Sequence, residues 1–180
     1  MIAIIGLGGV PGTGKSTLVR NLLGRLGTAR AFKGGLVSGT VYPTARTFVL
    51  GKYEAGERYP GTDRLSMSAQ PDVAQWLQKL ATDPNFDGWN LLFEGDRLFN
   101  LKFLTLCKAV SPASRFILLT AAPEILAARR AERGDTMAGA FVKGRETKLA
   151  NLKAHCEPWK SETEADRDAN TERLLGMLGA

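Results

Sequence analysis

Residues 9–16, which read Gly-Val-Pro-Gly-Thr-Gly-Lys-Ser, constrain the fold of this chain more than any other segment. They follow directly on the apolar run at residues 2–7, and a helical pattern begins at Lys15. Glycines at positions 9, 12 and 14 allow the backbone to curl so that successive N–H groups point into one concavity. A short strand, a glycine-rich loop and a helix in this order predict a βαβ unit within a parallel sheet.

The same segment matches the pattern Gly-x-x-x-x-Gly-Lys-Ser/Thr at every fixed position, which is typical of loops that bind nucleotide phosphates. The loop N–H groups and the positive end of the helix dipole attract an anion. We expect Lys15 to reach the β- and γ-phosphates and the Ser16 hydroxyl to bind Mg²⁺, with Thr17 assisting. ATP and Mg²⁺ are therefore the predicted cofactors, and the predicted nucleotide-binding residues are Gly9, Val10, Pro11, Gly12, Thr13, Gly14, Lys15, Ser16 and Thr17.

Short apolar runs alternate with helical patterns along the rest of the chain, which favours an α/β fold with a mainly parallel central sheet. We expect a single domain, a three-layer sandwich over residues 1–180. Residues 34–41 are a weaker strand prediction because of their glycines. The other strands are predicted over residues 2–7, 47–52, 90–93 and 115–120, and the helices over residues 15–26, 71–82, 98–110, 123–133, 141–155 and 162–178.

Cysteine content and hydropathy exclude several classes of protein. Cys107 and Cys156 are far apart in the sequence, which indicates neither a disulfide framework nor a zinc cluster and suits a reducing, cytoplasmic setting. No apolar run reaches the roughly 18 residues that a membrane-spanning helix needs. We therefore expect a soluble protein that has no membrane partner.

Basic residues are concentrated in one part of the chain. The net charge is +6, and the whole excess lies in residues 97–150, which carry ten basic and four acidic side chains. Such a segment attracts polyanions, either nucleotide phosphates or a nucleic-acid backbone. Scattered, solvated lysines and arginines are the simpler alternative.

Carboxylates near the end of the strand at residues 90–93 supply the acidic groups that a phosphate-transferring site needs. Glu94 ends this strand and Asp96 follows two residues later, so an extended chain would turn both toward one pocket. We predict Glu94 as a metal ligand, and Asp63 or Asp96 as the base that acts on an acceptor hydroxyl. A solvated turn with an Arg97 ion pair is the alternative for residues 94–97, and a helix N-cap is the alternative for Asp63. The choice of base among the three carboxylates stays open.

Arginines gather near the end of the helix at residues 123–133. Arg129, Arg130 and Arg133 are expected to neutralise the charge on a transferred phosphoryl group. The small, polar residues 134–140 suit a moving lid, and the lid region covers about residues 129–148. The alternative, cations that complement a helix C-terminus, accounts for one or two of the basic side chains in residues 129–148 but not for all six. The predicted acceptor-binding residues are Arg64, Arg97, Lys143 and Arg145.

Three features of the chain resemble the small P-loop kinases of the adenylate-kinase-like group, which includes zeta-toxin-type kinases. They are the loop at residues 9–16, the strand ending Glu94-Gly95, and the block from residue 116 to residue 133. In nucleoside monophosphate kinases the strand that corresponds to residues 90–94 usually ends with Asp-Gly, and a Pro-Arg pair follows. This chain has Glu94-Gly95 at that point and lacks the Pro-Arg pair. Residues 61–67, 94–100 and 143–148 are more similar to the bacteriophage 5-hydroxymethyluridine DNA kinases.

That resemblance implies a P-loop fold and ATP-dependent phosphorylation of the 5-hydroxymethyl group of 5-hydroxymethyluracil in DNA, a step in phage DNA hypermodification. The DNA would be the partner, in the cytoplasm of an infected host. The alternatives are a nucleoside monophosphate or small-metabolite kinase, a zeta-toxin-like kinase that acts on a nucleotide sugar, and a binding module that ATP switches without catalysis.

Overall fold

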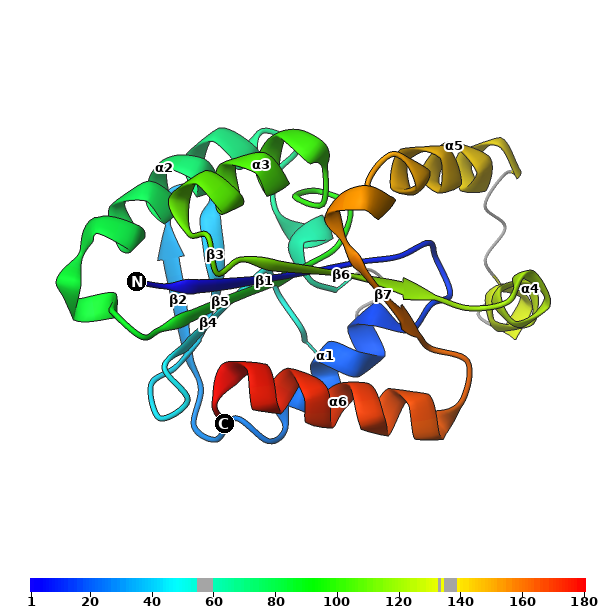
Figure 1. Ribbon diagram of the computed structural model, residues 1–180, viewed down its shortest axis with the longest axis horizontal. Helices are drawn as coiled ribbons and strands as arrows, with labels where there is room; N and C mark the ends of the chain where they lie inside the picture. The colour runs from blue at the N-terminus through cyan, green and yellow to red at the C-terminus, as the bar shows by residue number, and fades with distance from the viewer. Residues whose placement is uncertain (55–59, 133, 135–138) are drawn as a thin grey trace.

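The chain folds around one seven-stranded sheet with the strand order β2-β3-β4-β5-β1-β6-β7 (Figure 1). This computed structural model describes residues 1–54, 60–132, 134 and 139–180. The strands from β4 to β7 in that order are parallel, and β2 and β3 add an antiparallel hairpin at one edge. The strands are β1 (Ala3–Gly8), β2 (Arg30–Gly34), β3 (Val37–Tyr42), β4 (Thr47–Leu50), β5 (Asn90–Glu94), β6 (Arg115–Thr120) and β7 (Glu157–Lys160).

Helices cover both faces of the sheet, which confirms the predicted three-layer α/β sandwich. In Figure 1, α2 and α3 lie on one face, α1 and α6 lie on the other, and α4 and α5 lie toward the end where β6 points. Three short 3-10 helices, η1 (Thr62–Arg64), η2 (Pro84–Phe86) and η3 (Lys153–His155), complete the fold. The α-helices are α1 (Lys15–Leu23), α2 (Ala69–Thr82), α3 (Leu101–Val110), α4 (Pro123–Glu132), α5 (Gly139–Ala150) and α6 (Glu164–Leu178).

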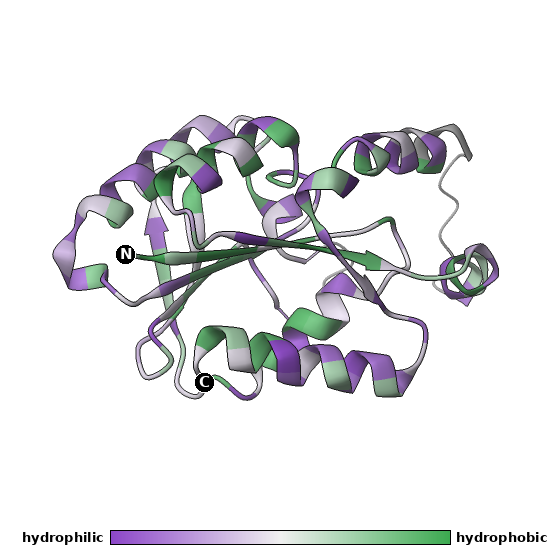
Figure 2. Cartoon of the chain, in the orientation of Figure 1, coloured by the Kyte–Doolittle hydropathy of each residue, from purple (hydrophilic) through white to green (hydrophobic). Residues whose placement is uncertain are grey.

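Two apolar clusters form the core, one on each face of the sheet. Ile4 of β1 belongs to the cluster that includes residues of α2 and α3, and its neighbour Ile5 belongs to the cluster that includes residues of α1 and α6. Successive strand residues point to opposite faces, so a strand that is covered on both faces is apolar throughout. Figure 2 shows this pattern as hydrophobic strands between helices that carry polar residues. The apolar run at the start of the sequence is an interior strand of the sheet, paired with β5 on one side and β6 on the other.

The boundaries of several predicted helices change where a side chain caps the helix. The helix expected from residue 98 begins at Leu101, because the Asn100 side chain accepts a hydrogen bond from the Phe103 N–H at 3.1 Å. The helix expected from residue 162 begins at Glu164, because Thr163 and Asp166 form a capping box. Such side chains satisfy N–H groups that have no partner within the helix. The helix expected over residues 141–155 ends at Ala150.

Two strands, β2 and β7, were not predicted, and β3 corresponds to the weaker prediction at residues 34–41. The end of the helix expected to reach residue 133 and most of the expected lid at residues 134–140 lie outside the described residues. Within the described ranges, none of the helices is both long enough and apolar enough to cross a bilayer.

Candidate active site

The loop between β1 and α1 has the backbone that the sequence pattern predicts. Gly9, Gly12 and Gly14 adopt positive φ angles of 150°, 96° and 83°, a region that side chains disfavour. Thr13 is fully buried, and its hydroxyl donates to the Val10 carbonyl at 2.9 Å, closing the turn. The result is a compact loop that leads directly into the first turn of α1.

Lys15 and Ser16, the first residues of α1, both face the mouth of this loop. The Lys15 ammonium donates to the Gly9 carbonyl at 2.7 Å and to the Val10 carbonyl at 3.3 Å. The Ser16 hydroxyl donates to Oε1 of Glu94 at 3.1 Å. Glu94 reaches this position because β5 pairs in parallel with β1, with Glu94 opposite Leu7. The sheet register therefore brings together the three side chains predicted for phosphate and metal binding.

Glu94 is a deeply buried carboxyl group, with 1% of its surface exposed. Its pKa is raised from 4.5 to about 7, mainly by burial; Lys15 and the Ser16 hydrogen bond oppose this shift, and the nearby Asp63 and Asp96 carboxylates contribute to it. Gly61 packs so closely against it that a Cβ there would overlap the carboxylate. A bound cation would offset the cost of ionising this group, since an opposite charge favours the charged form.

Tyr53 is a further residue of this site, and its place near Glu94 was not predicted from the sequence. Its hydroxyl is buried and has no hydrogen-bond partner among the residues that the structure describes. Burial, followed by the charge of Glu94, raises the pKa of Tyr53 well above its usual range. The sequence signal was that tyrosines alternate with basic residues in this region, which suits either a base-binding groove or a strand and loop packed by tyrosines.

Asp63 lies in η1, next to the end of β5. The Thr62 hydroxyl donates to the Glu94 carbonyl at 2.6 Å, which ties η1 to this strand. Oδ1 of Asp63 accepts the Arg97 N–H at 3.1 Å, and Nη2 of Arg97 donates to the Asp63 carbonyl at 3.2 Å. Arg97 also contacts the sulfur of Met67. The alternative of an N-cap is not observed, because Asp63 accepts the N–H of Arg97 in the β5–α3 loop.

Asp96 has different bonding partners from Glu94, although its charge acts on the Glu94 carboxyl. Gly95 between them has a φ of 109°, which ends the alternation of a strand. The Asp96 carboxylate pairs with Arg145, and its carbonyl accepts from Nζ of Lys148 at 3.0 Å. Burial lowers the pKa of Lys148, partly opposed by the charge of Asp96. Two basic residues of α5 are thus docked on the loop that follows β5.

Arg129 lies behind the phosphate loop and binds backbone carbonyl groups. Its Nη1 donates to the carbonyls of Gly12 and Ser161 at 3.1 and 2.9 Å, and its Nη2 donates to the Glu162 carbonyl at 2.6 Å. Nη1 of Arg130 is buried and has no hydrogen-bond partner in the described part of the chain. Arg133 lies outside the described residues. Arg64 and Lys143 have exposed side chains.

The donor set around Ser16 and Glu94 fits Mg²⁺. Magnesium is commonly held by one or two protein oxygens, with phosphate oxygens and water completing its shell. A hydroxyl and a buried carboxylate 3.1 Å apart at the phosphate loop supply such oxygens. The described residues include no group of three or more His, Cys, Asp or Glu that could hold a metal ion without a nucleotide.

Comparisons with solved structures show the fold of known P-loop kinases. A gluconokinase from Sinorhizobium meliloti 1021 is similar over 98% of this chain and 95% of its own, with 17% identity and a TM-score of 0.50. A shikimate kinase from Bacteroides thetaiotaomicron is similar over 99% of both chains, with 14% identity and a TM-score of 0.51. No curated protein sequence matches this chain. The family described as AAA domain matches residues 5–150. Since this range covers most of the chain and includes the whole phosphate loop, the protein belongs to the AAA domain family.

Proposed function

We propose that the protein is an ATP-dependent kinase that transfers the γ-phosphoryl group to an alcohol. The observation that carries this proposal is the phosphate loop, whose Lys15 and Ser16 meet the buried carboxyl of Glu94. Kinases with such a loop use ATP with Mg²⁺ and catalyse mainly by positioning and charge stabilisation. Family membership and the P-loop kinase fold support the same class of reaction.

Each side chain has a distinct role in this proposal. The loop N–H groups and Lys15 hold the phosphates, while Ser16 and Glu94 hold Mg²⁺. When bound there, Mg²⁺ would supply positive charge that offsets the charge of the phosphates. The acceptor oxygen forms a bond to the γ-phosphorus as the bond to the β-phosphate oxygen breaks, and ADP leaves. Arg130 and Arg133 remain candidates for stabilising the transferred charge.

We assign Asp63 as the base that accepts the proton of the acceptor hydroxyl. The Asp96 carboxylate is ion-paired with Arg145, and the Glu94 carboxyl is the proposed Mg²⁺ ligand beside Ser16, so both have other roles. The Asp63 carboxylate accepts an N–H of Arg97 through Oδ1, which orients it toward the end of β5. A carboxylate held in this way can accept the proton as the oxygen attacks.

A small hydroxyl-bearing metabolite is the acceptor class that the observations support best. The two kinases that share this fold over nearly their whole length are named for small molecules. The basic side chains of residues 97–150 are also largely engaged with the chain itself, so fewer of their donors are available to a nucleic-acid backbone. Those with such contacts are Arg97, Lys108, Arg115, Arg129, Arg145 and Lys148.

DNA that contains 5-hydroxymethyluracil is the second candidate, and one specific observation favours it. The three stretches that resemble the phage DNA kinases, residues 61–67, 94–100 and 143–148, contact one another. Asp63 bonds to Arg97, and Asp96 binds both Arg145 and Lys148. Residues that form one motif of a DNA-modifying site would be expected to meet in this way.

Transfer of labelled phosphate from ATP tests both candidates. The acceptors are a panel of small alcohols that includes sugars, free nucleosides and nucleotides, and matched oligonucleotides with thymine or 5-hydroxymethyluracil. We expect label in a small acceptor, and Lys15→Ala to lower the rate by at least about 100-fold, as the loss of a transition-state donor does. Lys102→Ala, an exposed lysine of α3, is the matched control and should transfer normally.

Each outcome separates the alternatives. Label only in hydroxymethylated DNA would replace the small acceptor with the second candidate. Nucleotide binding without label in any acceptor would favour an ATP-switched binding module. A Lys15→Ala variant as active as the wild type would exclude this loop as the catalytic site.

A further inference from the structure

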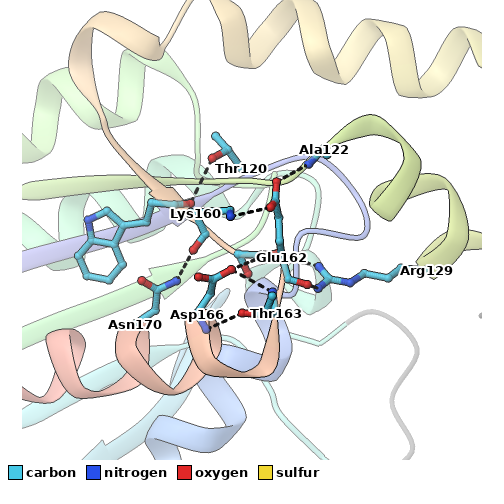
Figure 3. Close-up of polar contacts among 10 residues, drawn as sticks. Thr120, Ala122, Arg129, Lys160, Glu162, Thr163, Asp166 and Asn170 are labelled. Carbon is cyan, nitrogen blue, oxygen red and sulfur yellow. Dashed lines mark hydrogen bonds and ion pairs between the residues drawn. The ribbon is translucent and has the colours of Figure 1, made fainter.

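The turn between β7 and α6, residues 161–163, lies against the outer side of the phosphate loop. Ser161 is 6% exposed, and its N–H donates to the Thr120 carbonyl at 2.8 Å, which fixes the turn to the end of β6. Figure 3 shows Glu162, Thr163 and Arg129 in this region, where α4 and the start of α6 approach each other. The segment is far from the phosphate loop in the sequence but adjacent to it in the fold.

Ser161 contacts the phosphate loop directly through its side chain. Its hydroxyl donates to the Thr13 carbonyl at 2.8 Å, and both residues are buried. A Cβ added at Gly14 would lie 3.5 Å from the same hydroxyl, so the loop and the turn are in close contact. A buried donor and acceptor that satisfy each other in this way are costly to separate.

Arg129 holds Ser161 in this position from the other side. A single nitrogen, Nη1, donates both to the Ser161 carbonyl and to the Gly12 carbonyl, and Nη2 donates to the Glu162 carbonyl. The guanidinium therefore joins the loop and the turn through charge-assisted hydrogen bonds, which are stronger than neutral ones.

The rest of the turn is held by its own side chains. The Glu162 carboxylate accepts the Ala122 N–H at 3.0 Å and pairs with Lys160 at 2.9 Å. Oδ2 of Asp166 accepts the N–H groups of Glu162 and Thr163, both at 2.9 Å (Figure 3). This network gives Ser161 a rigid base from which to hold the phosphate loop.

We propose that Ser161 is a positioning residue for the phosphates of ATP, an inference that rests on the proposed function. In a trans peptide the carbonyl and the following N–H point in opposite directions. A hydroxyl that holds the Thr13 carbonyl outward therefore turns the Gly14 N–H toward the inside of the loop, where it can bind a phosphate. Ser161 touches neither the phosphate nor the acceptor, and it acts through this one peptide group.

The test compares Ser161→Ala with Ser111→Ala in the full-length protein. The Ser111 hydroxyl is also buried and also donates to a distant carbonyl, that of Ile2, at 2.6 Å, but it lies at the end of α3, away from the loop. The measurements are the melting temperature and the dissociation constants for ATP and for inorganic tripolyphosphate, a probe that binds through phosphate alone. We expect both variants to lose similar thermal stability. Only Ser161→Ala should bind ATP and tripolyphosphate about tenfold more weakly, which corresponds to the loss of one hydrogen bond.

Ser161→Cys is the second variant, since it nearly keeps the side-chain volume and replaces the hydroxyl with a weak donor. It should fold even if Ser161→Ala does not, and it should bind tripolyphosphate more weakly than the wild type. Wild-type affinity in the Ser161 variants would overturn the inference, as would an equal loss of affinity in Ser111→Ala. If the wild type binds neither ATP nor tripolyphosphate, the proposed function fails first and the inference falls with it.

Discussion

Glu94 is deeply buried, which disfavours its ionised form, yet the proposed binding of Mg²⁺ beside Ser16 needs that form. The carboxyl is 1% exposed, and its Oε1 accepts a hydrogen bond from the Ser16 hydroxyl. Without a cation, such a group prefers to keep its proton, because burial disfavours the charged form. If Glu94 holds Mg²⁺ as proposed, its ionised form is therefore costly until the metal and nucleotide bind.

This conflict predicts how stability depends on pH in the absence of Mg²⁺. The Glu94 carboxyl has a pKa of about 7 in the folded protein and an ordinary value near 4.5 when exposed. Between these two values the unfolded chain binds fewer protons than the folded one, so the free energy of unfolding falls as pH rises from about 4.5 to about 7. The fall attributable to this group is about 3 kcal/mol.

Glu94→Gln removes the titrating group, so its stability relative to the wild type should increase from pH 5 to pH 8 while phosphoryl transfer is lost. Thermal melts in a chelator across this range measure the difference. Glu172→Gln, which changes an exposed carboxylate of α6, is the control and should follow the wild type. If the curves of Glu94→Gln and the wild type run parallel at all pH values, the burial argument is wrong.

Among the elements, the strand and helix that flank the phosphate loop could be predicted from the sequence. The strands β2 and β7 and the docking of α5 could not. The glycines and the Lys-Ser pair of the motif are typical of a loop between a strand and a helix, which is where the structure has it, between β1 and α1. β2 escaped prediction because its residues are mostly exposed and show no apolar alternation, and β7 because it is four residues long and contains Pro158. The partners of Asp96 depend on the φ of Gly95 and on where α5 docks, and neither follows from sequence spacing.

Docking of α5 on the β5–α3 loop gives a prediction at the level of this helix. Asp96→Asn removes the charge that pairs with Arg145, and that pair is only partly exposed. We expect amide hydrogen exchange in the described part of α5 to accelerate by about threefold to tenfold, the effect of losing roughly 1 kcal/mol.

Arg25→Ala is the control for this experiment, because it breaks an ion pair with Glu172 on the opposite side of the sheet. It should leave exchange in α5 unchanged. Unaltered exchange in Asp96→Asn would mean that apolar contacts alone hold α5, such as those of the buried Leu149.

At the scale of the whole molecule, net charge overstates how strongly the protein attracts polyanions. The excess of +6 arises in residues 97–150, yet many of those side chains bond to carbonyls and carboxylates of the same chain. Sequence alone shows the sign and the segment of the charge, whereas the fold decides how much of it faces outward.

Salt dependence measures that difference. For a small acceptor, we expect phosphoryl transfer to change by less than about threefold between 50 and 200 mM salt, because few counterions are released. Affinity for duplex DNA should be weak and show a shallow slope, whereas a site that makes six to ten phosphate contacts would lose roughly 10³- to 10⁵-fold over this range. The slope is that of the logarithm of DNA affinity against the logarithm of salt concentration. A steep slope that becomes shallower by about one in Lys143→Ala would instead indicate a DNA acceptor.

The order of strands in the sheet also determines when the phosphate loop can become functional during synthesis of the chain. β1 is made first, but it pairs with β5 and β6, which follow only after residue 90. The contacts of Ser161 with Thr13 form later still. The phosphate loop of the nascent chain would therefore lack these supports until the ribosome has made residues 90–161. ATP can then stabilise the native state only after β7 has been made and has joined the sheet.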